Sequence, residues 1–496
     1  MKKKIFLLLS FGSFLLLLVC VYFSISIADW KQVGKSVSLK DFPPEKNELS
    51  RDFSDYSKKT EGSPIPEISP DRSTVIVSQS DFSANKLSSN ISFENGDLAT
   101  MSVSSAVPEN PVNVDSGIEL AARYIIQNTD VNGRLAYQRH LNPAVLSDPT
   151  KYNILRHAGT IYAAWLYEQE YPRNEEIRDV RIRLSEYMLK NYLREIENGM
   201  FTIASDPTEE SLPEPQAKLG ACGLALIGMS NLLPEKKVQL EILRGLGDFI
   251  LFMQKEDGSF HSKYIYSTKS FDPKFLSLYY PGEAALGLLS LFEVDPQEKW
   301  LNGAKKALLY LADSRKDQKL VREYDHWAML ATEKLWAVPE NSLTPIERQK
   351  LLYHARQMAD LALMTQIYAP GRPEDGSMGG NISPCSNGTK LEGLIAIHNV
   401  MNDYPQYQKK IRLAMDRLAA FLLRAQIREP YLRGGFPGSA AWRLPGGPAK
   451  SYVVRIDNVQ HILSAWINYR KIKRNLNDEA AEIQVLNKEN EMGRKP

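Results

Sequence analysis

The sequence predicts an all-α fold in which six helical hairpins close into a ring, and three observations support this prediction. From about residue 116 to residue 470, an amphipathic helix, a polar turn and a second helix recur six times. The repeats are spaced by roughly 50 to 60 residues, which is typical of a repeat architecture. The first helix of each pair has one charged face, whereas the second is rich in small apolar residues. This difference is expected for outer helices that enclose an inner ring.

The turns of the repeats share a glutamine or acidic residue, usually followed by glycine. The clearest are Gln127–Gly133, Gln254–Phe260, Gln366–Ser377 and Gln426–Phe436, and weaker copies are Glu195–Phe201 and Asp317–Leu320. We expect outer helices at 116–127, 174–195, 237–254, 297–313, 346–366 and 407–426. We expect inner helices at 153–170, 217–233, 281–293, 325–337, 387–402 and 456–470.

Glycines within the expected inner helices favour closure of the ring. Glycine inside a helix costs about 1 kcal/mol relative to alanine, so the presence of Gly220, Gly223 and Gly287 indicates close packing of helix backbones. The alternative is an open superhelix of stacked helix pairs. Six repeats, with the last ending shortly before the C-terminal tail, favour the closed form.

The chain divides into four segments, of which the predicted ring, 113–472, is the third. Lysines 2–4 precede an apolar run from Ile5 to Ala28, which is long enough to span a bilayer. Segment 1–28 is thus a membrane anchor that leaves the rest outside the cytoplasm (periplasmic or extracellular), or a signal peptide cleaved after Ala28 to give a secreted protein. Segment 29–112 is a Ser- and Pro-rich linker with possible short strands at 74–78 and 98–103. The charged tail, 473–496, is expected to fray.

Composition narrows the range of partners. The formal net charge is +2, and no basic stripe interleaved with aromatic residues is present, so we expect no nucleic-acid partner. The three cysteines are Cys20, Cys222 and Cys385. The last two fall on nearly opposite inner helices, so we expect two free thiols.

Segment 116–472 resembles the six-hairpin (α/α)6 toroid superfamily, which houses glycoside hydrolases, polysaccharide lyases and sugar epimerases. The turns after Gln254 and Gln426 are also similar to the Gln-Trp repeats of triterpene cyclases, with phenylalanine in place of tryptophan. The chain has neither the Asp-x-Asp-Asp nor the Asp-Asp-x-x-Asp motif, which disfavours a cyclase. The resemblance implies a polysaccharide or oligosaccharide ligand bound where the inner helices begin, with no cofactor and no metal.

In such a ring the inner helices all begin at one rim, and their first residues would line a funnel. These residues are Arg156, His157, Glu214, Lys218, Tyr279, Tyr280, Glu283, Tyr324, Asp325, His326, Trp327, Asn387, Lys390, Glu392, Arg455, Asp457 and His461. Asp457 and His461 share one helical face and could bind a metal, but no third ligand of known spacing accompanies them.

We predict catalytic roles for Asp325, Glu283 and His326, because carboxylates and imidazoles act as general acids and bases. The predicted substrate-binding residues are Tyr279, Tyr280, Tyr324, Trp327, Arg156, His157 and Asp457. Each residue also has a purely structural interpretation. Asp325 is a normal helix N-cap, and His157 lies in an apolar context typical of a buried core histidine.

The sequence therefore predicts an exported enzyme that acts on an envelope or extracellular carbohydrate. Glycoside hydrolysis by paired carboxylates is the first hypothesis, and the separation of the two carboxyl groups would distinguish inversion from retention. A uronate lyase or epimerase that uses tyrosine, histidine and arginine is the second. A non-catalytic glycan-binding or scaffold protein of an envelope machine is the third.

Overall fold

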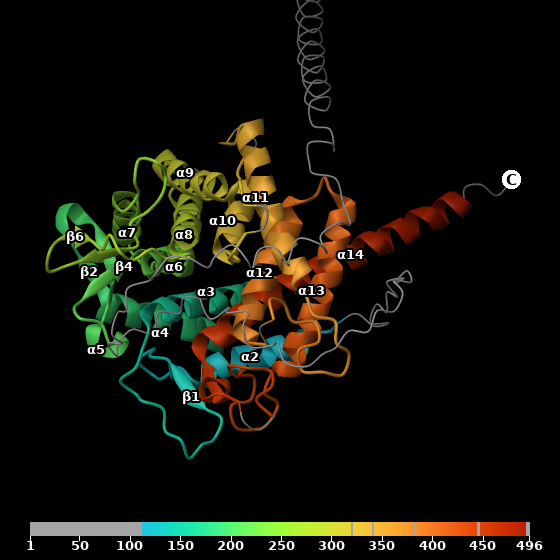
Figure 1. Cartoon of the computed structure of the whole chain (residues 1–496), viewed down its shortest axis with the longest axis horizontal. Helices are drawn as coiled ribbons and strands as arrows, with labels where there is room; N and C mark the ends of the chain where they lie inside the picture. Colours follow the sequence, from blue (N-terminus) through green and yellow to red (C-terminus); the bar gives the residue numbers. More distant parts are fainter. Residues whose placement is uncertain (1–111, 319–320, 340–341, 381, 444–446, 493–496) are drawn as a thin grey trace, which may run out of the picture. The chain divides into compact units, whose positions relative to one another are not determined.

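The computed structural model of the chain describes residues 112–492 apart from 319–320, 340–341, 381 and 444–446, and it is mostly helical (Figure 1). The inner helices are α3 (Ile154–Glu170), α6 (Leu219–Met229), α8 (Tyr280–Val294), α10 (His326–Trp336), α12 (Pro384–Val400) and α14 (Ile456–Met492). The outer helices are α2 (Asp115–Gln127), α4 (Glu175–Tyr192), α7 (Leu240–Phe252), α9 (Glu298–Arg315), α11 (Pro345–Met364) and α13 (Pro405–Ala425). The six predicted hairpins are confirmed.

The inner helices form a closed ring. Each packs against the next in chain order, and α14 packs against α3 to complete the circle. The outer helices pack against the outside of this ring, for example α4 on α3 and α9 on α8. Asp457 at the start of α14 contacts Arg156 at the start of α3 and Cys385 at the start of α12. Tyr324, which lies just before α10, contacts Lys390 in the second turn of α12. These four helices therefore begin at the same end of the ring, which we call the rim. An open superhelix is therefore excluded.

Glycines bring neighbouring inner helices into backbone contact. A Cβ atom placed on Gly287 of α8 would lie 2.6 Å from the carbonyl oxygen of Gly223 in α6. A Cβ atom placed on Gly223 would lie 2.4 Å from the carbonyl oxygen of Glu283. Real Cβ atoms do not approach other atoms so closely, and so only glycine fits. The helix-weakening glycines of the sequence thus serve close packing, as predicted.

A repeated turn joins each of several outer helices to the next. Its glutamine side chain donates one hydrogen bond to a carbonyl of its own turn and a second to a carbonyl of the next outer helix. The three sets are Gln254 to Gly258 and Gly303, Gln366 to Gly376 and Ala414, and Gln426 to Gly434 and Gly117. Because Gly117 lies in α2, the third set connects the last outer helix to the first.

The glycine of each turn packs on the next outer helix around the ring. Gly434 has a φ of +89°, in the left-handed region that favours glycine, and a Cβ atom there would lie 2.0 Å from the carbonyl oxygen of Leu120 in α2. Gly133, Gly258 and Gly376 lie equally close to backbone carbonyls of α4, α9 and α13. The same turn therefore recurs four times within this chain, and each time its glycine contacts a backbone carbonyl of the next outer helix.

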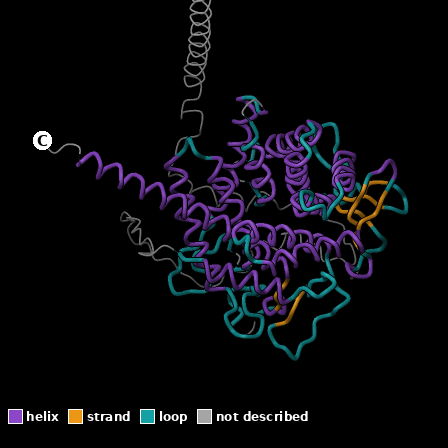
Figure 2. Tube along the Cα trace, turned by 180° about the vertical axis from the view of Figure 1, so that it is seen from behind, coloured by secondary structure: helices purple, strands orange, loops and turns teal. Residues whose placement is uncertain are grey.

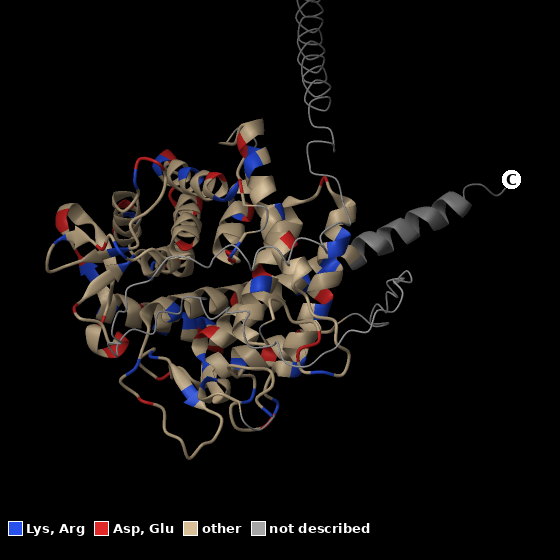
Figure 3. Ribbon diagram, viewed as in Figure 1, with Lys and Arg blue, Asp and Glu red and all other residues tan. Residues whose placement is uncertain are grey.

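Side-chain caps fix several helix starts. Asn153, Asn174 and Asp325 each accept a hydrogen bond from the backbone N–H three residues ahead, at the starts of α3, α4 and α10. Thr344 and Glu347 form a reciprocal capping box at the start of α11. Charged residues of both signs are spread over the described helices (Figure 3).

The loops contain short strands that the sequence analysis does not predict (Figure 2). Strand β1 (Gln138–His140) pairs antiparallel with β7 (Val453–Arg455). The strands β2 (Leu193–Glu195), β3 (Phe201–Ser205), β4 (Gln216–Lys218), β5 (Lys263–Ile265) and β6 (Ser270–Phe271) form an antiparallel sheet in that order. Neighbouring loops satisfy their backbone hydrogen bonds with each other in this way. The pairs β2–β3 and β5–β6 are local hairpins, whereas β1–β7 joins the first and last loops of the ring.

The helix α14 continues through the charged tail to Met492, and the expected fraying of that tail stays a prediction. Residues 473–492 contain no proline or glycine and many good helix formers, so nothing in them ends the helix. Among residues 112–492, no described helix has the length and apolar character needed to cross a bilayer. The predicted anchor at 5–28 and the predicted linker strands lie outside the described residues.

Replacement of Gly434 by alanine should destabilise the domain more than replacement of Gly371. Both glycines have positive φ values, +89° and +82°, which cost alanine about 1–2 kcal/mol. Only Gly434 faces a neighbouring helix, since nothing lies within 4 Å of a Cβ atom at Gly371. Overpacking against α2 should add about 1–3 kcal/mol. Urea unfolding of both variants measures the difference, and equal losses would contradict the closing role of the turn.

Candidate active site

Four side chains from three inner helices meet within the ring, and we call them the central cluster: His326 of α10, Glu392 of α12, and His461 and Ser464 of α14. His461 donates a hydrogen bond from Nδ1 to Glu392 Oε2 over 2.9 Å, and the Ser464 hydroxyl donates to Oε1. The Nε2 atom of His326 lies 3.7 Å from the same Oε2 atom. The two imidazole rings are 5.3 Å apart between centroids. One carboxylate thus lies beside two imidazoles.

His326 is the least satisfied member of the cluster. Its side chain is only 2% exposed, yet neither ring nitrogen has a hydrogen-bond partner among the described residues. Buried polar atoms normally have partners, so this ring is available to a ligand. Burial, together with positive charge on His461 and Lys390, holds the pKa of His326 well below its usual range. The imidazole of His326 is therefore neutral at pH 7.

Aromatic rings surround the two histidines. Tyr279 of α8 packs edge-on against His326 at 5.3 Å between centroids, and Trp327 lies 5.9 Å from His461. Trp327 also lies 6.4 Å from Tyr162 of α3, the inner helix opposite α10 in the ring. Trp327 is 3% exposed, and its ring packs against both histidines of the cluster. Aromatic faces with a few polar groups are typical of small-ligand sites.

Lys390 of α12 is a buried cation beside the cluster. Its ammonium group donates to the hydroxyl of Ser386 at 2.9 Å and to the carbonyl of Ser386 at 3.3 Å, with no carboxylate partner among the described residues. Burial lowers the pKa of Lys390 to about 8, although Cys385 acts in the opposite direction. An unpaired buried charge is costly. Its place near His326 therefore suits a ligand group that carries or develops negative charge.

An arginine pair occupies the rim above α3 and α14. Asp457 forms ion pairs with Arg156 at 3.1 Å and with Arg455 at 2.7 Å, and Arg156 also donates to the Tyr137 hydroxyl. Burial alone would raise the pKa of Asp457, but the two arginines outweigh it and hold that pKa well below its ordinary value. Cys385 lies 4.0 Å from the same carboxylate. Two arginines share one acid, so the rim keeps an excess positive charge.

Glu283 lies between α8 and α6 and not in the central cluster. Its carboxyl group is 3% exposed, Oε2 has no hydrogen-bond partner among the described residues, and a Cβ atom on Gly220 would overlap it. Burial, with a contribution from the charge of Asp325, raises the pKa of Glu283 to about 8. This side chain is therefore a neutral carboxylic acid at pH 7.

Two predicted site residues are held in structural contacts. Asp325 caps α10 through the N–H of Ala328 and forms a 2.9 Å ion pair with Arg315 of the outer helix α9. Tyr324 is buried, and its hydroxyl donates to the carbonyl of Lys390. Both side chains therefore connect helices of the wall, and we do not place them in the reacting group.

His157 is also held in the wall, between α3 and α4. Its Nε2 donates to the carbonyl of Leu184 at 2.8 Å, and its Nδ1 accepts from the Tyr152 hydroxyl at 2.6 Å. Burial lowers the pKa of His157 to about 4. Both nitrogens are satisfied, so this is a core histidine. Tyr280 is half-buried beside Gly220, on the same side as Glu283.

The central cluster has the donor types of a metal site. One atom each of His326, Glu392 and His461 lie within 4.8 Å of one another, and two imidazoles with one carboxylate suit zinc. Two observations disfavour a cation. The positive charge of Lys390 acts on His326, and histidine ligands normally have a partner on the second ring nitrogen, which His326 lacks. We therefore treat the cluster as acid–base groups.

The sequence analysis places Glu392, Lys390 and His461 at helix starts, considers His461 only as a possible metal ligand with Asp457, and omits Ser464. Asp457 and His461, which it considers together, have different partners in the structure. The only available signal was polarity: Glu392 and Ser464 interrupt inner helices that are otherwise apolar. Free Cys222 and Cys385 agree with the expected absence of a disulfide between them.

Comparison with solved structures agrees with the fold. The cellobiose 2-epimerase from Spirochaeta thermophila has a TM-score of 0.53 and 11% identity, covering 74% of this chain and 100% of its own. The cellobiose 2-epimerase from Bacillus thermoamylovorans has a TM-score of 0.51 and 11% identity, and the match covers 71% of this chain and 97% of its own. A sugar epimerase from a ruminal bacterium has a TM-score of 0.50 and 12% identity, and the match covers 70% of this chain and 97% of its own. No protein-family profile and no curated protein sequence matches the chain. At these identities the likeness establishes the six-hairpin toroid fold.

Replacement of Glu283 by glutamine should flatten the dependence of stability on pH. Glu283 has an ordinary pKa of 4.5 and a folded-state pKa of about 8, so the folded chain binds this proton more tightly. Its contribution is fully present below about pH 4.5 and is lost as the pH rises towards 8. Thermal melts of both proteins from pH 5 to 8.5 measure the effect. If the melting temperatures fall in parallel, Glu283 is not the neutral acid described.

Proposed function

We propose that the chain is a carbohydrate-active enzyme that moves a proton at the carbon next to a sugar carbonyl, as in epimerisation or aldose–ketose isomerisation. The observation that carries this proposal is the pair of imidazoles from α10 and α14 beside the single carboxylate of Glu392. Enzymes of proton abstraction need such positioned acids and bases. Three of the structural neighbours are named as sugar epimerases, which supports the same reaction class.

The hydrogen bonds of the cluster determine the roles of its members. Glu392 accepts the Nδ1 proton of His461, which leaves Nε2 of that ring as the atom that can take or return a proton. His326 is neutral as well. One imidazole takes the proton from the carbon of an open-chain sugar, and the other ring, when protonated, returns one to carbon or oxygen. The hydrogen moves as a proton throughout, so the reaction needs no redox cofactor.

Lys390 completes this proposed machinery. Removal of a proton beside a carbonyl places negative charge on the sugar oxygen, and a preorganised cation stabilises that charge strongly in a site that excludes water. The ammonium of Lys390 lies near His326 and has no carboxylate partner among the described residues. The positive charge of Lys390 would also hinder the approach of a metal ion. A metal site and an acid–base site therefore differ in what they require: the first needs a bound cation, and the second needs the charged Lys390.

The hydrolase hypothesis has less support from the geometry. Glycoside hydrolysis needs two carboxyl groups on either side of the bond. Asp325 is held by Arg315, and Glu283 lies against Gly220 between α6 and α8. Neither belongs to the central cluster. We retain the proposal that the ring is exported and that residues 5–28 anchor it to the membrane.

Asparagine at His326 or at His461 should lower the rate of carbon-bound hydrogen exchange by about 10²- to 10⁴-fold, the usual contribution of a general acid or base. The assay incubates the full chain with a panel of neutral and acidic reducing sugars in D₂O and follows deuterium at the carbon next to the carbonyl by NMR. His398→Asn is the matched control, because His398 contacts Asn399 and Arg412 near the far end of α12. EDTA should not change the rate.

Cleavage of oligosaccharides with gain of one water and no deuterium would contradict this proposal in favour of hydrolysis. Binding of sugars without either reaction would favour the scaffold hypothesis. A rate that EDTA abolishes and zinc restores would instead assign the central cluster to a metal ion.

Lys390 should determine the alkaline limb of the activity profile. Because its pKa lies near 8, the ammonium loses its charge as the pH rises through that value, and activity should fall with it. Lys390→Arg keeps the charge and should move the limb to higher pH, whereas Lys390→Met should lower the rate about 10²- to 10³-fold at pH 7. Rates measured from pH 6 to 10 give both results. An unchanged limb in the arginine variant would remove Lys390 from the mechanism.

A further inference from the structure

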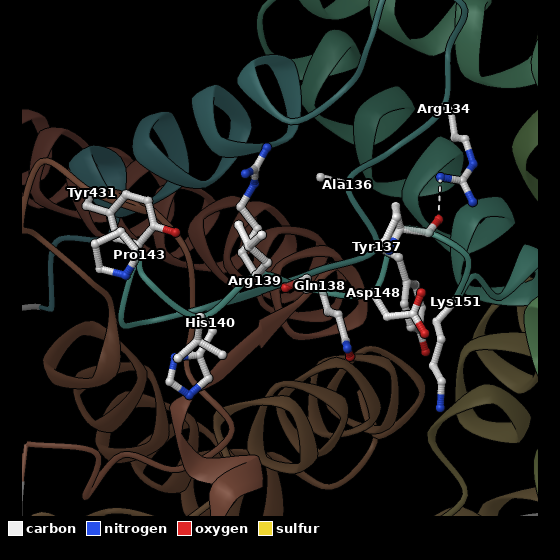
Figure 4. A pocket seen from close by; sticks show the side chains of 14 residues that line it. Arg134, Ala136, Tyr137, Gln138, Arg139, His140, Pro143, Asp148, Lys151 and Tyr431 are labelled. Carbon is white, nitrogen blue, oxygen red and sulfur yellow. Dashed lines mark hydrogen bonds between the residues drawn. The ribbon is translucent and has the colours of Figure 1, made fainter.

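A cavity of about 290 Å³ lies beside the rim, outside the central cluster (Figure 4). It is lined by the loop from Arg134 to Lys151, which contains β1, and by Tyr431 from the loop after α13. We call it the side pocket. Ligand pockets commonly span about 300–1,000 Å³, so the side pocket is of a size for a small unit such as one sugar ring.

The lining of the side pocket is basic. It includes three cations, Arg134, Arg139 and Lys151, and one carboxylate, Asp148, which is exposed and hydrogen-bonded to Thr150. Arg134 is paired with Glu209 at 3.1 Å. The other two cations have no carboxylate partner among the described residues. Even with Glu209 counted, an excess positive charge remains.

Arg139 is held ready for a ligand by a neutral group. Its Nε donates to the side-chain oxygen of Asn128 at 2.8 Å, which orients the guanidinium without cancelling its charge. Two tyrosines, Tyr137 and Tyr431, contribute ring surface to the same cavity, and Tyr431 is 42% exposed. Cations together with aromatic surface are suited to a sugar that bears an acidic group.

The side pocket is continuous with the rim of the proposed active site. Tyr137, which lines the pocket, accepts a hydrogen bond from Arg156 of the arginine pair. Strand β1 of the pocket pairs with β7, and in this pairing Gln138 is opposite Arg455. Since Arg156 and Arg455 share the single acid Asp457, the positive charge extends from the rim into the pocket.

We propose that the side pocket binds an acidic sugar unit next to the unit that enters the central cluster, so that the substrate is an acidic oligosaccharide. This inference rests on the proposed function, because it assigns the substrate class of the same site. It concerns binding alone and needs no turnover to be tested.

The test measures equilibrium binding of the full chain to tetragalacturonate, galacturonate and maltotetraose by calorimetry at low and high salt. We expect tetragalacturonate to bind at least 10-fold more tightly than maltotetraose at low salt, with a preference that shrinks as salt screens the charges. The double variant R139A/K151A should weaken tetragalacturonate at least 5-fold and leave maltotetraose unchanged. The control R173A/K237A removes two exposed cations outside the pocket lining and should change none of the affinities.

Three outcomes would overturn the proposal: equal affinity for acidic and neutral tetramers, equal effects of the two double variants, or equally tight pocket-dependent binding of the oligonucleotide dT4. The last would identify a general polyanion site. Repeating the measurement with His326→Asn separates this inference from the proposed function. Pocket-dependent binding that persists without any exchange activity would support the acidic ligand while leaving the reaction unsupported.

Discussion

The turn of glutamine and glycine that ends several outer helices is the constraint on which the molecule depends. Its amide joins two carbonyls from different hairpins, and its glycine lets the turn rest on the backbone of the next outer helix. The last copy, at Gln426 and Gly434, rests on α2. This contact closes the ring, and across the closed ring Trp327 of α10, beside the central cluster, meets Tyr162 of α3.

Within that closed ring, polar groups are buried at positions where they lack full compensation. His326 has two unpaired nitrogens, Lys390 has no acidic partner among the described residues, and Glu283 remains a protonated acid. Each is unfavourable for folding by itself. The surrounding core offsets this cost through extensive burial of Leu, Ala, Trp and Tyr side chains. Such uncompensated groups on a well-packed scaffold are the usual mark of a site kept ready for a ligand.

Sequence reasoning identified the hairpins because helical periodicity and turn chemistry are local. It placed both helices of every pair to within a few residues, apart from the end of α14, which continues to Met492. The glycine-rich inner helices correctly indicated close packing. It could not choose among polar residues at the rim. Asp325 and Glu392 look alike in sequence, but one turns outward to Arg315 and the other inward to His461. That choice depends on neighbours more than sixty residues away for Glu392, and the pairing of β1 with β7 depends on a still more distant partner.

The contact between Gln426 and Gly117 joins residues 309 positions apart, and this has a consequence for how the chain acquires its structure. During synthesis the opening helix of the domain must wait, without its final neighbours, until the closing hairpin has been made. Contacts between residues so far apart in sequence form slowly, so we expect ring closure to follow the formation of the individual hairpins.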